Sequence, residues 1–284
     1  MTRARDLANF ADGTIGDVSG NLTGNVTGNI NGLTPQASNM QPFNRIINGA
    51  MTIDQRNAGA SVSTASTTSG YTVDRWQYSV SEYSKVSFQQ NAGSVTPPVG
   101  FMNYLGATSA SAFSVTSGDY FTINHKIEGF NTADLGFGTA NAKTVTLSFF
   151  ARSSLTGTFG AVINNSDNTR AYPINYTISS ANTWEYKTVT FTGDTGGTWQ
   201  TGNLTGIQIR FGLGVGSTYS GTAGAWTGTV NILGATGGVS VVGTSGATFY
   251  ITGVQLEAGS SASSFAYEDY ATTLRKCYRF YWRF

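Results

Sequence analysis

A four-residue repeat between residues 16 and 32 constrains this chain more than any other feature of the sequence. It reads Gly16-Asp-Val-Ser, Gly20-Asn-Leu-Thr, Gly24-Asn-Val-Thr and Gly28-Asn-Ile-Asn. In an extended strand, alternation places the glycines and apolar residues on one face and the polar residues on the other. A helix is disfavoured because each interior glycine costs about 1 kcal/mol relative to alanine. The repeat therefore predicts a strand with one apolar stripe.

A single strand cannot bury that stripe by itself, and the chain holds no second copy of the repeat. The simplest partner is another copy of the same chain. We expect residues 13–35 to form a homotrimeric stem, on the order of 60 Å long at the usual rise of a strand. A dimer and a flexible Gly/Asn linker are the alternatives. The side chains expected to face the trimer axis are Ile15, Val18, Leu22, Val26, Ile30 and Leu33.

The first twelve residues are predicted to form a short attachment helix. Thr2 can cap it and Asp12-Gly13 ends it. A helix this short is not stable alone in water, so we expect it to dock on another protein, with a frayed tail as the alternative. No apolar core of a secretory signal follows the basic residues, so we expect synthesis in a cytoplasm. The residues expected to make the attachment are Arg3, Arg5, Leu7 and Phe10.

Composition excludes several classes of function. Only 11% of the residues are charged and the net charge is +1, which gives no electrostatic footprint for nucleic acid. No uncharged run is apolar enough to insert in a membrane. One Cys and one His argue against a disulfide framework, a thiolate cluster or a poly-His metal site. We therefore expect no cofactor.

After a linker at 36–43, residues 44–284 read as an all-β head. Eight or more short strands separated by Gly, Ser and Asn turns predict a jelly-roll-like β-sandwich. The Gly-rich region 212–247 is expected to be a long, functional or disordered loop. Alternating aromatic residues in the stretch 272–284 predict a C-terminal strand. The clearest strands are expected around 76–80, 86–90, 121–128, 145–151, 159–163, 184–191, 207–213 and 249–256.

No catalytic constellation stands out, so we expect a protein that is not an enzyme. His125 lies on the apolar face of its strand and is expected in the core. A glycosidase needs only two carboxylates, and Asp134, Asp167, Glu185 and Asp194 leave a polysaccharide depolymerase open as an alternative. The oxygen-rich turn at 164–168 could hold a structural Ca²⁺, which is not predicted.

Binding chemistry is better supported by this composition. Neutral sugars are recognised by aromatic faces and by Asn, Gln and Thr hydrogen bonds. Three aromatic residues in Gly/Thr-rich loops are candidates for glycan binding, with core packing as the alternative for each. They are Trp199, Tyr219 and Trp226.

Several stretches, taken together, resemble tail-fibre and receptor-binding proteins of tailed bacteriophages, especially those of cyanobacterial and marine phages. The Trp184 strand and the Gly253-Val-Gln-Leu-Glu257 strand also resemble carbohydrate-binding-module jelly rolls. The stretches that carry the phage resemblance are Thr2-Arg-Ala-Arg-Asp-Leu-Ala-Asn9, Asn44-Arg-Ile-Ile-Asn-Gly-Ala-Met51, Asp54-Gln-Arg-Asn57, Thr72-Val-Asp-Arg-Trp76, Thr146-Leu-Ser-Phe-Phe-Ala-Arg152, Phe249-Tyr-Ile-Thr-Gly-Val-Gln-Leu-Glu-Ala-Gly259 and Leu274-Arg-Lys-Cys-Tyr-Arg-Phe-Tyr281.

The resemblance implies a homotrimeric fibre of the virion, made in the bacterial host cytoplasm. Its N-terminus would join a phage tail or adaptor protein, and its head would bind host cell-surface polysaccharide. A structural or decorating fibre without receptor binding is the alternative.

Overall fold

A computed structural model describes residues 44–283 of the chain. The predicted attachment helix (1–12), stem (13–35) and linker (36–43) lie outside the described residues, as does Phe284. Within the described range, no helix has the length and apolar character needed to cross a membrane.

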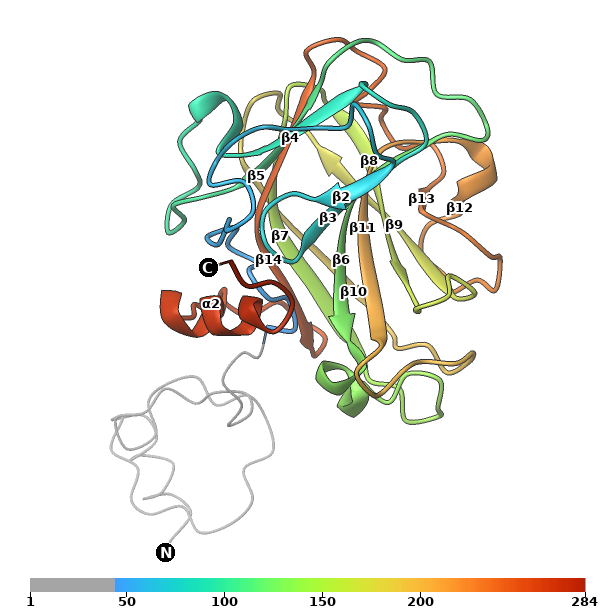
Figure 1. The fold of residues 1–284 in the computed structure, drawn as a ribbon. Coiled ribbons are helices and arrows are strands. Elements are labelled where there is room, and N and C mark those ends of the chain that lie inside the picture. Colours follow the sequence, from blue (N-terminus) through green and yellow to red (C-terminus); the bar gives the residue numbers. More distant parts are fainter. Residues whose placement is uncertain (1–43, 284) are drawn as a thin grey trace, which may run out of the picture. The chain divides into compact units, whose positions relative to one another are not determined.

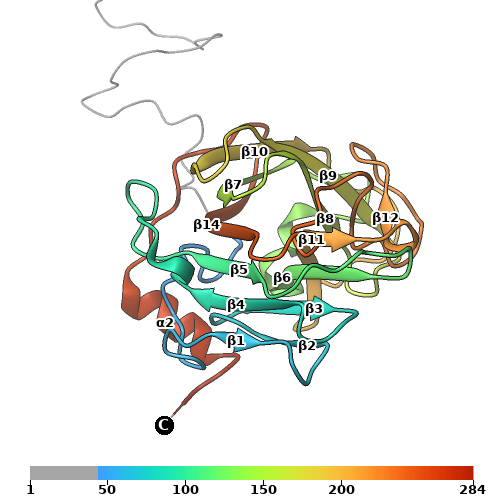
Figure 2. The same cartoon turned by 90° about the horizontal axis from the view of Figure 1, so that it is seen from above.

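The described chain is a sandwich of two antiparallel, six-stranded sheets, as Figures 1 and 2 show. The chain passes repeatedly from one sheet to the other, so neighbours in a sheet are seldom neighbours in sequence. This arrangement confirms the predicted all-β, jelly-roll-like head. The first sheet has the order β1 (Val62–Ser63), β4 (Val86–Gln90), β5 (Leu105–Ser109), β14 (Thr248–Ala258), β7 (Val145–Ser153) and β10 (Glu185–Phe191).

The second sheet carries the candidate site described below. Its central strands are β6 and β11, which pair along most of their length. Three-residue 3₁₀ turns connect several strands: η1 (Ala92–Ser94), η2 (Gly129–Asn131), η3 (Ala133–Leu135) and η4 (Ser217–Tyr219). The second sheet has the order β2 (Ser69–Tyr71), β3 (Trp76–Val80), β6 (Tyr120–Glu128), β11 (Thr205–Val215), β8 (Gly157–Asn164) and β9 (Ala171–Ile178).

Aromatic side chains join the two sheets across the core. Phe149 of β7 meets Phe211 of β11 with ring centroids 5.0 Å apart. Tyr78 of β3 stacks on Phe88 of β4 at 5.1 Å. Each fully buried ring of this kind contributes about 1.5–3 kcal/mol by leaving water. The aromatic content of the sequence thus supplies the contact between the layers.

The structure contradicts the C-terminal strand predicted at 272–284. Residues Tyr270–Tyr278 form the helix α2, and Asp269 caps it by accepting a hydrogen bond from the Thr272 backbone N at 3.0 Å. Thr273 and Cys277, one helical turn apart, are its buried residues, and burial raises the pKa of the Cys277 thiol to about 12. The alternating aromatics misled because the helix ends among them, and the cap lies several residues upstream.

The glycine-rich region 212–247 is largely part of the folded body. β11 continues to Val215, and the short strands β12 (Ser220–Gly221) and β13 (Gly234–Ala235) pair in parallel. β13 lies against β8, where a Cβ on Gly160 would come 3.0 Å from the Ala235 backbone N. Glycine here permits a close approach of two backbones, so the segment covers part of the second sheet.

Candidate functional site

Trp199 lies in the connection between β10 and β11, and its ring is only 9% exposed. Its Nε1 donates to the Gly196 carbonyl at 3.1 Å. The ring meets Phe137 edge to face at a centroid distance of 4.9 Å. These contacts make Trp199 a packed side chain of the sandwich edge.

Trp226 joins Trp199 in what we call the aromatic cluster. The two indole rings are 5.5 Å apart, and Trp226 donates from Nε1 to the Thr192 carbonyl at 2.8 Å. Trp226 is half-buried. The aromatic cluster comprises Phe137, Tyr172, Phe191, Trp199 and Trp226.

An ion pair between a buried carboxylate and a half-buried arginine supports the aromatic cluster. Asp194 accepts from Nε of Arg170 at 2.7 Å and from its Nη2 at 2.6 Å. Trp199 Nε1 also approaches Asp194 at 3.3 Å, and the Asp194 hydrogen bond raises the pKa of Arg170. The carboxylate therefore fixes both its cation and the loop that carries Trp199.

Tyr219, the third predicted sugar contact, lies in η4 and meets Tyr120 edge to face at 5.2 Å. It is half-buried. In the described part of the chain, no ring contact links it to Trp199 or Trp226. The structure thus brings the two tryptophans together and leaves Tyr219 separate from them, and their role in glycan binding stays a prediction.

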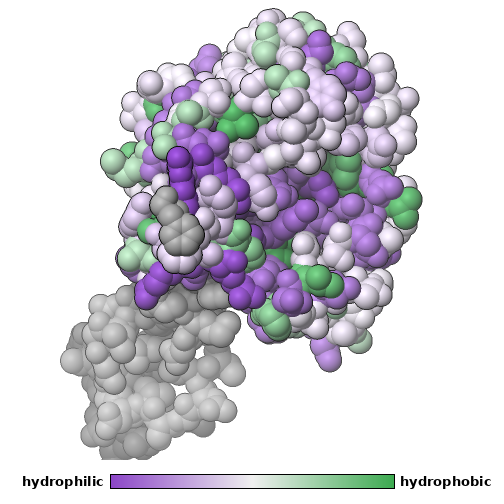
Figure 3. Space-filling view, in the orientation of Figure 1, coloured by the Kyte–Doolittle hydropathy of each residue, from purple (hydrophilic) through white to green (hydrophobic). Residues whose placement is uncertain are grey.

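A different group of side chains lies on the outward face of the second sheet. Alternation along β3, β6 and β11 turns apolar residues into the core and polar ones outward. Strand pairing places Gln77 opposite Asn124, and Asn124 opposite Arg210; one step along, Lys126 is opposite Gln208. We call these five residues the polar face. Figure 3 shows hydrophilic side chains gathered in a hollow over the middle of this sheet.

Arg210 is the most unusual member of the polar face, since it is a charged residue and yet only 7% exposed. Its Nη2 donates to Gln208 Oε1 at 2.8 Å and to Asn168 Oδ1 at 3.2 Å, but its Nε has no partner in the described chain. Burial lowers its pKa to about 10, so the guanidinium remains charged at neutral pH. Buried polar groups are nearly always paired, and an exception calls for an explanation.

Gln208, a neighbour on the polar face, holds Arg210 in place, and Asn124 adds a second unpartnered atom, an acceptor. Gln208 Nε2 donates to the carbonyls of Asn165 and Ser166, each at 3.0 Å. Asn124 donates to Ser79 Oγ at 2.8 Å, whereas its buried Oδ1 has no partner among the described residues. The oxygen-rich turn at 164–168, considered above for Ca²⁺, thus serves here as hydrogen-bond acceptor for Gln208 and Arg210.

A cavity of about 180 Å³ opens beside the polar face. Gln77 and Lys126 line it from β3 and β6, and Tyr71 adds an aromatic ring. Arg75 lies against Phe280, with its guanidinium carbon 3.4 Å from the ring centroid. The remaining lining residues are Glu128, Asn203 and Thr205.

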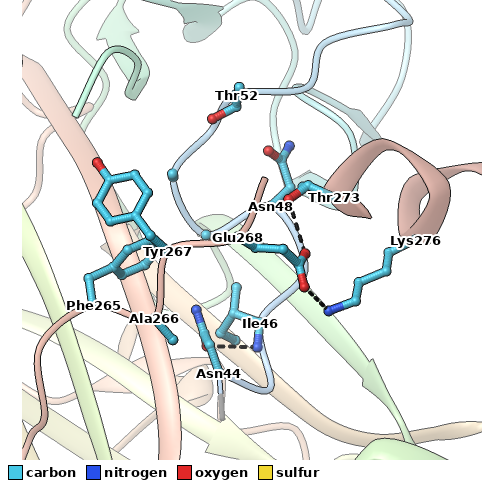
Figure 4. A pocket seen from close by; sticks show the side chains of 12 residues that line it. Asn44, Ile46, Asn48, Thr52, Phe265, Ala266, Tyr267, Glu268, Thr273 and Lys276 are labelled. Carbon is cyan, nitrogen blue, oxygen red and sulfur yellow. Dashed lines mark hydrogen bonds and ion pairs between the residues drawn. The ribbon is translucent and has the colours of Figure 1, made fainter. Parts of the chain in front are cut away.

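Another cavity, of about 190 Å³, lies between the 44–52 segment and α2 (Figure 4). Lys276 and Thr273 both point to Glu268 there, and Thr273 Oγ1 donates to it at 3.0 Å. Asn44 Oδ1 accepts from the Ile46 backbone N at 2.9 Å. These groups satisfy one another, in contrast to Asn124 and Arg210 on the polar face.

The carboxylates considered for a depolymerase each have a local partner. Asp194 pairs with Arg170, Asp134 with Arg45 and Glu185 with Lys187, while Asp167 accepts from Thr169 Oγ1. Over residues 44–283, no three or more His, Cys, Asp or Glu side chains gather in a way that could hold a metal ion.

His125 occupies the core, as the sequence predicts. Its Nε2 is 3.0 Å from the Ile47 carbonyl and its ring meets Trp76 edge to face at 4.9 Å. Burial lowers its pKa to about 3. The imidazole is therefore neutral at physiological pH and packs in the core between the sheets.

Sequence reasoning missed the polar face as a site. Its alternation was visible, but polar residues opposite an apolar stripe are the ordinary pattern of a solvated strand. The one signal in the sequence was the position of Arg210 in the middle of a long predicted strand. A strand inside a sheet has neighbouring strands on both sides, and these can bury a residue at its centre.

No protein-family model matches the chain, and no curated protein matches it. Among solved structures, it is similar to the enzymatically active domain of bacteriophage CBA120 tailspike protein 4, at 15% identity and TM-score 0.38, covering 70% of this chain and 22% of that one. It is also similar to a family 11 carbohydrate-binding module from Clostridium thermocellum in complex with a β-1,3-1,4-mixed-linked tetrasaccharide, at 14% identity and TM-score 0.34, covering 67% and 92%.

A third similar structure is the CBM22-1 xylan-binding domain of Paenibacillus barcinonensis Xyn10C, at 9% identity and TM-score 0.31, covering 72% of this chain and 99% of that one. The chain thus spans about a fifth of the phage protein and nearly all of the binding modules. Likenesses this distant assign no function, so the candidate site rests on the side chains of this chain itself.

Proposed function

We propose that this chain is a bacteriophage tail fibre whose sandwich binds a host-surface polysaccharide on the polar face. One observation carries the binding proposal: a cavity lined by Tyr71, Gln77 and Lys126 opens beside the polar face, where Asn124 Oδ1 and Arg210 Nε on adjacent strands have no partner in the described chain. The amide of Gln77 and the ammonium of Lys126 offer hydrogen bonds to sugar hydroxyls at this cavity. The adjoining cavity supplies the ring of Tyr71 for an apolar sugar face.

The binding proposal is tested with the full-length chain on an array of bacterial surface polysaccharides. Gln77→Ala removes a side chain that lines the cavity. Thr188→Ala is the matched control, because Thr188 is exposed on β10 of the other sheet. We expect Gln77→Ala to weaken binding by about three- to tenfold, the range for one lost hydrogen bond, and the control to bind normally.

Three outcomes would contradict our proposals. Absence of binding to any polysaccharide and to host cells would favour a structural or decorating fibre. Equal binding by both variants, with loss on changing Tyr219 or Trp226 to Ala, would move the site to the residues predicted from the sequence. Release of reducing ends from a bound polysaccharide would make the protein a depolymerase, contrary to our proposal that it is not an enzyme.

We also propose that three copies assemble through residues 13–35 and that residues 1–12 join a tail protein. The support is the period-four apolar stripe and the phage-like motifs of the sequence. Three sites on one stem would bind with avidity, because the second contact is effectively intramolecular. Deleting 11–35 should lower the oligomeric state measured by native mass spectrometry. An unchanged trimer would place the assembly contacts in the head.

A further inference from the structure

Positive charge gathers on the polar face and beside it without matching carboxylates. Arg75, Lys126 and Arg210 each lack an ion pair with any Asp or Glu in the part of the chain that the structure describes. Glu128 lines the adjoining cavity, but Arg279 already holds it, with Nε 2.9 Å from Oε2 and Nη2 3.0 Å from Oε1. Three positive charges therefore remain on one face of a chain whose net charge is only +1.

These three cations also influence one another. Burial lowers the pKa of Lys126, and the positive charges of Arg210 and then Arg75 lower it further. Burial likewise lowers the pKa of Arg75. Mutual repulsion and burial both destabilise the charged forms of these side chains. An anion placed among them would reduce the repulsion and offset the free-energy cost of burying the charges.

Arg210 is prepared for such an anion. Gln208 and Asn168 hold its Nη2, so the guanidinium loses little freedom when a ligand arrives. Its Nη1 donates to no group in the described chain and is not among the buried atoms, so it is free to meet an anion. A hydrogen bond between a guanidinium and an anionic oxygen is about twice as strong as one between neutral groups.

We infer that the polysaccharide bound by the polar face is acidic, and that a carboxylate or sulfate group of a sugar meets Arg210 and Lys126. This inference rests on the proposed glycan binding and sharpens it. It differs from the neutral sugar that the low charge of the sequence predicts. The exposed position of Lys126 lets the anion enter, and the buried Arg210 fixes its place.

The test measures binding of the full-length chain to polygalacturonate and to the same polymer with its carboxylates methyl-esterified. Chondroitin sulfate and chondroitin form a second pair that isolates the sulfate group. We expect at least about tenfold tighter binding to the charged polymer of one pair. Binding should weaken as salt rises from about 0.05 M to about 0.5 M, since screening shortens the reach of the cations.

Three variants locate the effect. Arg210→Met should lower the affinity for the acidic polymer at least about tenfold, and Lys126→Met, at an exposed position, should lower it about threefold. Arg152→Met is the matched control: this arginine lies on β7 of the other sheet, pairs with no carboxylate and donates from Nε to the Asn182 carbonyl at 3.0 Å. It should leave the affinity unchanged.

The two proposals fail in different ways. Equal or tighter binding to the esterified or unsulfated polymers would overturn the acidic specificity and leave glycan binding standing. Equal losses of affinity for Arg152→Met and Arg210→Met would show that only the overall positive charge of the protein matters. That result would also overturn the acidic specificity of the polar face. No binding to any polymer, charged or neutral, would overturn glycan binding itself.

Discussion

The aromatic cluster and the polar face both differ in burial from what the sequence around their residues predicts. Trp199 and Trp226 stand among glycines and threonines, as ligand-binding rings do, yet they pack against each other and against Phe137. Arg210 stands inside a strand pattern, as a solvated residue does, yet it is buried with an unused donor. Local context describes exposure poorly when loops fold back over sheets.

The largest expected effect tests whether the aromatic cluster is structural. Trp199→Ala removes a packed ring and should lower the free energy of unfolding by about 4 kcal/mol, as measured by denaturant titration. Trp199→Phe, which keeps part of the packing, should lose less than half as much. Full stability of Trp199→Ala together with lost polysaccharide binding would return this ring to the role predicted from the sequence.

The next effect concerns the ion pair beneath the cluster. Asp194→Asn weakens two charge-assisted hydrogen bonds from the half-buried Arg170 and should lower the free energy of unfolding by about 2 kcal/mol. Asp167→Asn is the control, because Asp167 accepts only from the Thr169 hydroxyl at the surface. Equal stability of the two variants would show that Asp194 does not support the loop.

The next prediction concerns the pH dependence of stability, which arises from His125 on the core face of the second sheet. His125 on the core face is neutral, with its pKa lowered to about 3 by burial, whereas an unfolded histidine titrates near pH 6.5. Between these values the unfolded chain binds the extra proton, so stability falls as pH falls. From pH 6.5 to about 5 we expect a loss of up to about 2 kcal/mol.

The chain has one histidine, so the variant isolates this effect. His125→Gln should remove the difference between the pH 6.5 and pH 5 unfolding midpoints that the native chain shows. A native chain whose stability does not change over this range would contradict the burial of a neutral imidazole.

The smallest stability effect belongs to the polar face. Arg210→Met removes a buried charge that has no carboxylate partner. The free energy of unfolding should therefore change by less than about 1 kcal/mol in either direction. Comparing the stability loss of Arg210→Met with that of Trp199→Ala distinguishes a residue that serves binding from one that serves packing. A loss of several kcal/mol would make Arg210 a structural residue and weaken both proposals.

Strand periodicity predicted most of the fold. The alternation of Phe121, Ile123 and Ile127 with polar residues placed β6 and its core face correctly, and it placed His125 in the core. The helix α2 was missed because its cap at Asp269 and its buried pair Thr273 and Cys277 are weak signals beside a conspicuous run of aromatics. Helix formation at such a site depends on the surface the helix packs against.

The candidate site was harder to predict than the fold. A sequence shows that Asn124, Lys126, Gln208 and Arg210 leave the core side of their strands. It does not show that β6 and β11 are neighbours, because they are separated by more than seventy residues and four other strands. Gln77, Asn124 and Arg210 lie side by side only because β6 pairs with β3 on one side and with β11 on the other.

By itself, the sequence determined the alternating strands and the aromatic core, because these depend on short-range periodicity and residue type. Only the tertiary structure decided which aromatics are packed and which cations lack a partner. Burial and charge pairing are set by segments distant in the chain, such as the 164–168 turn and β13, that fold over the same sheet.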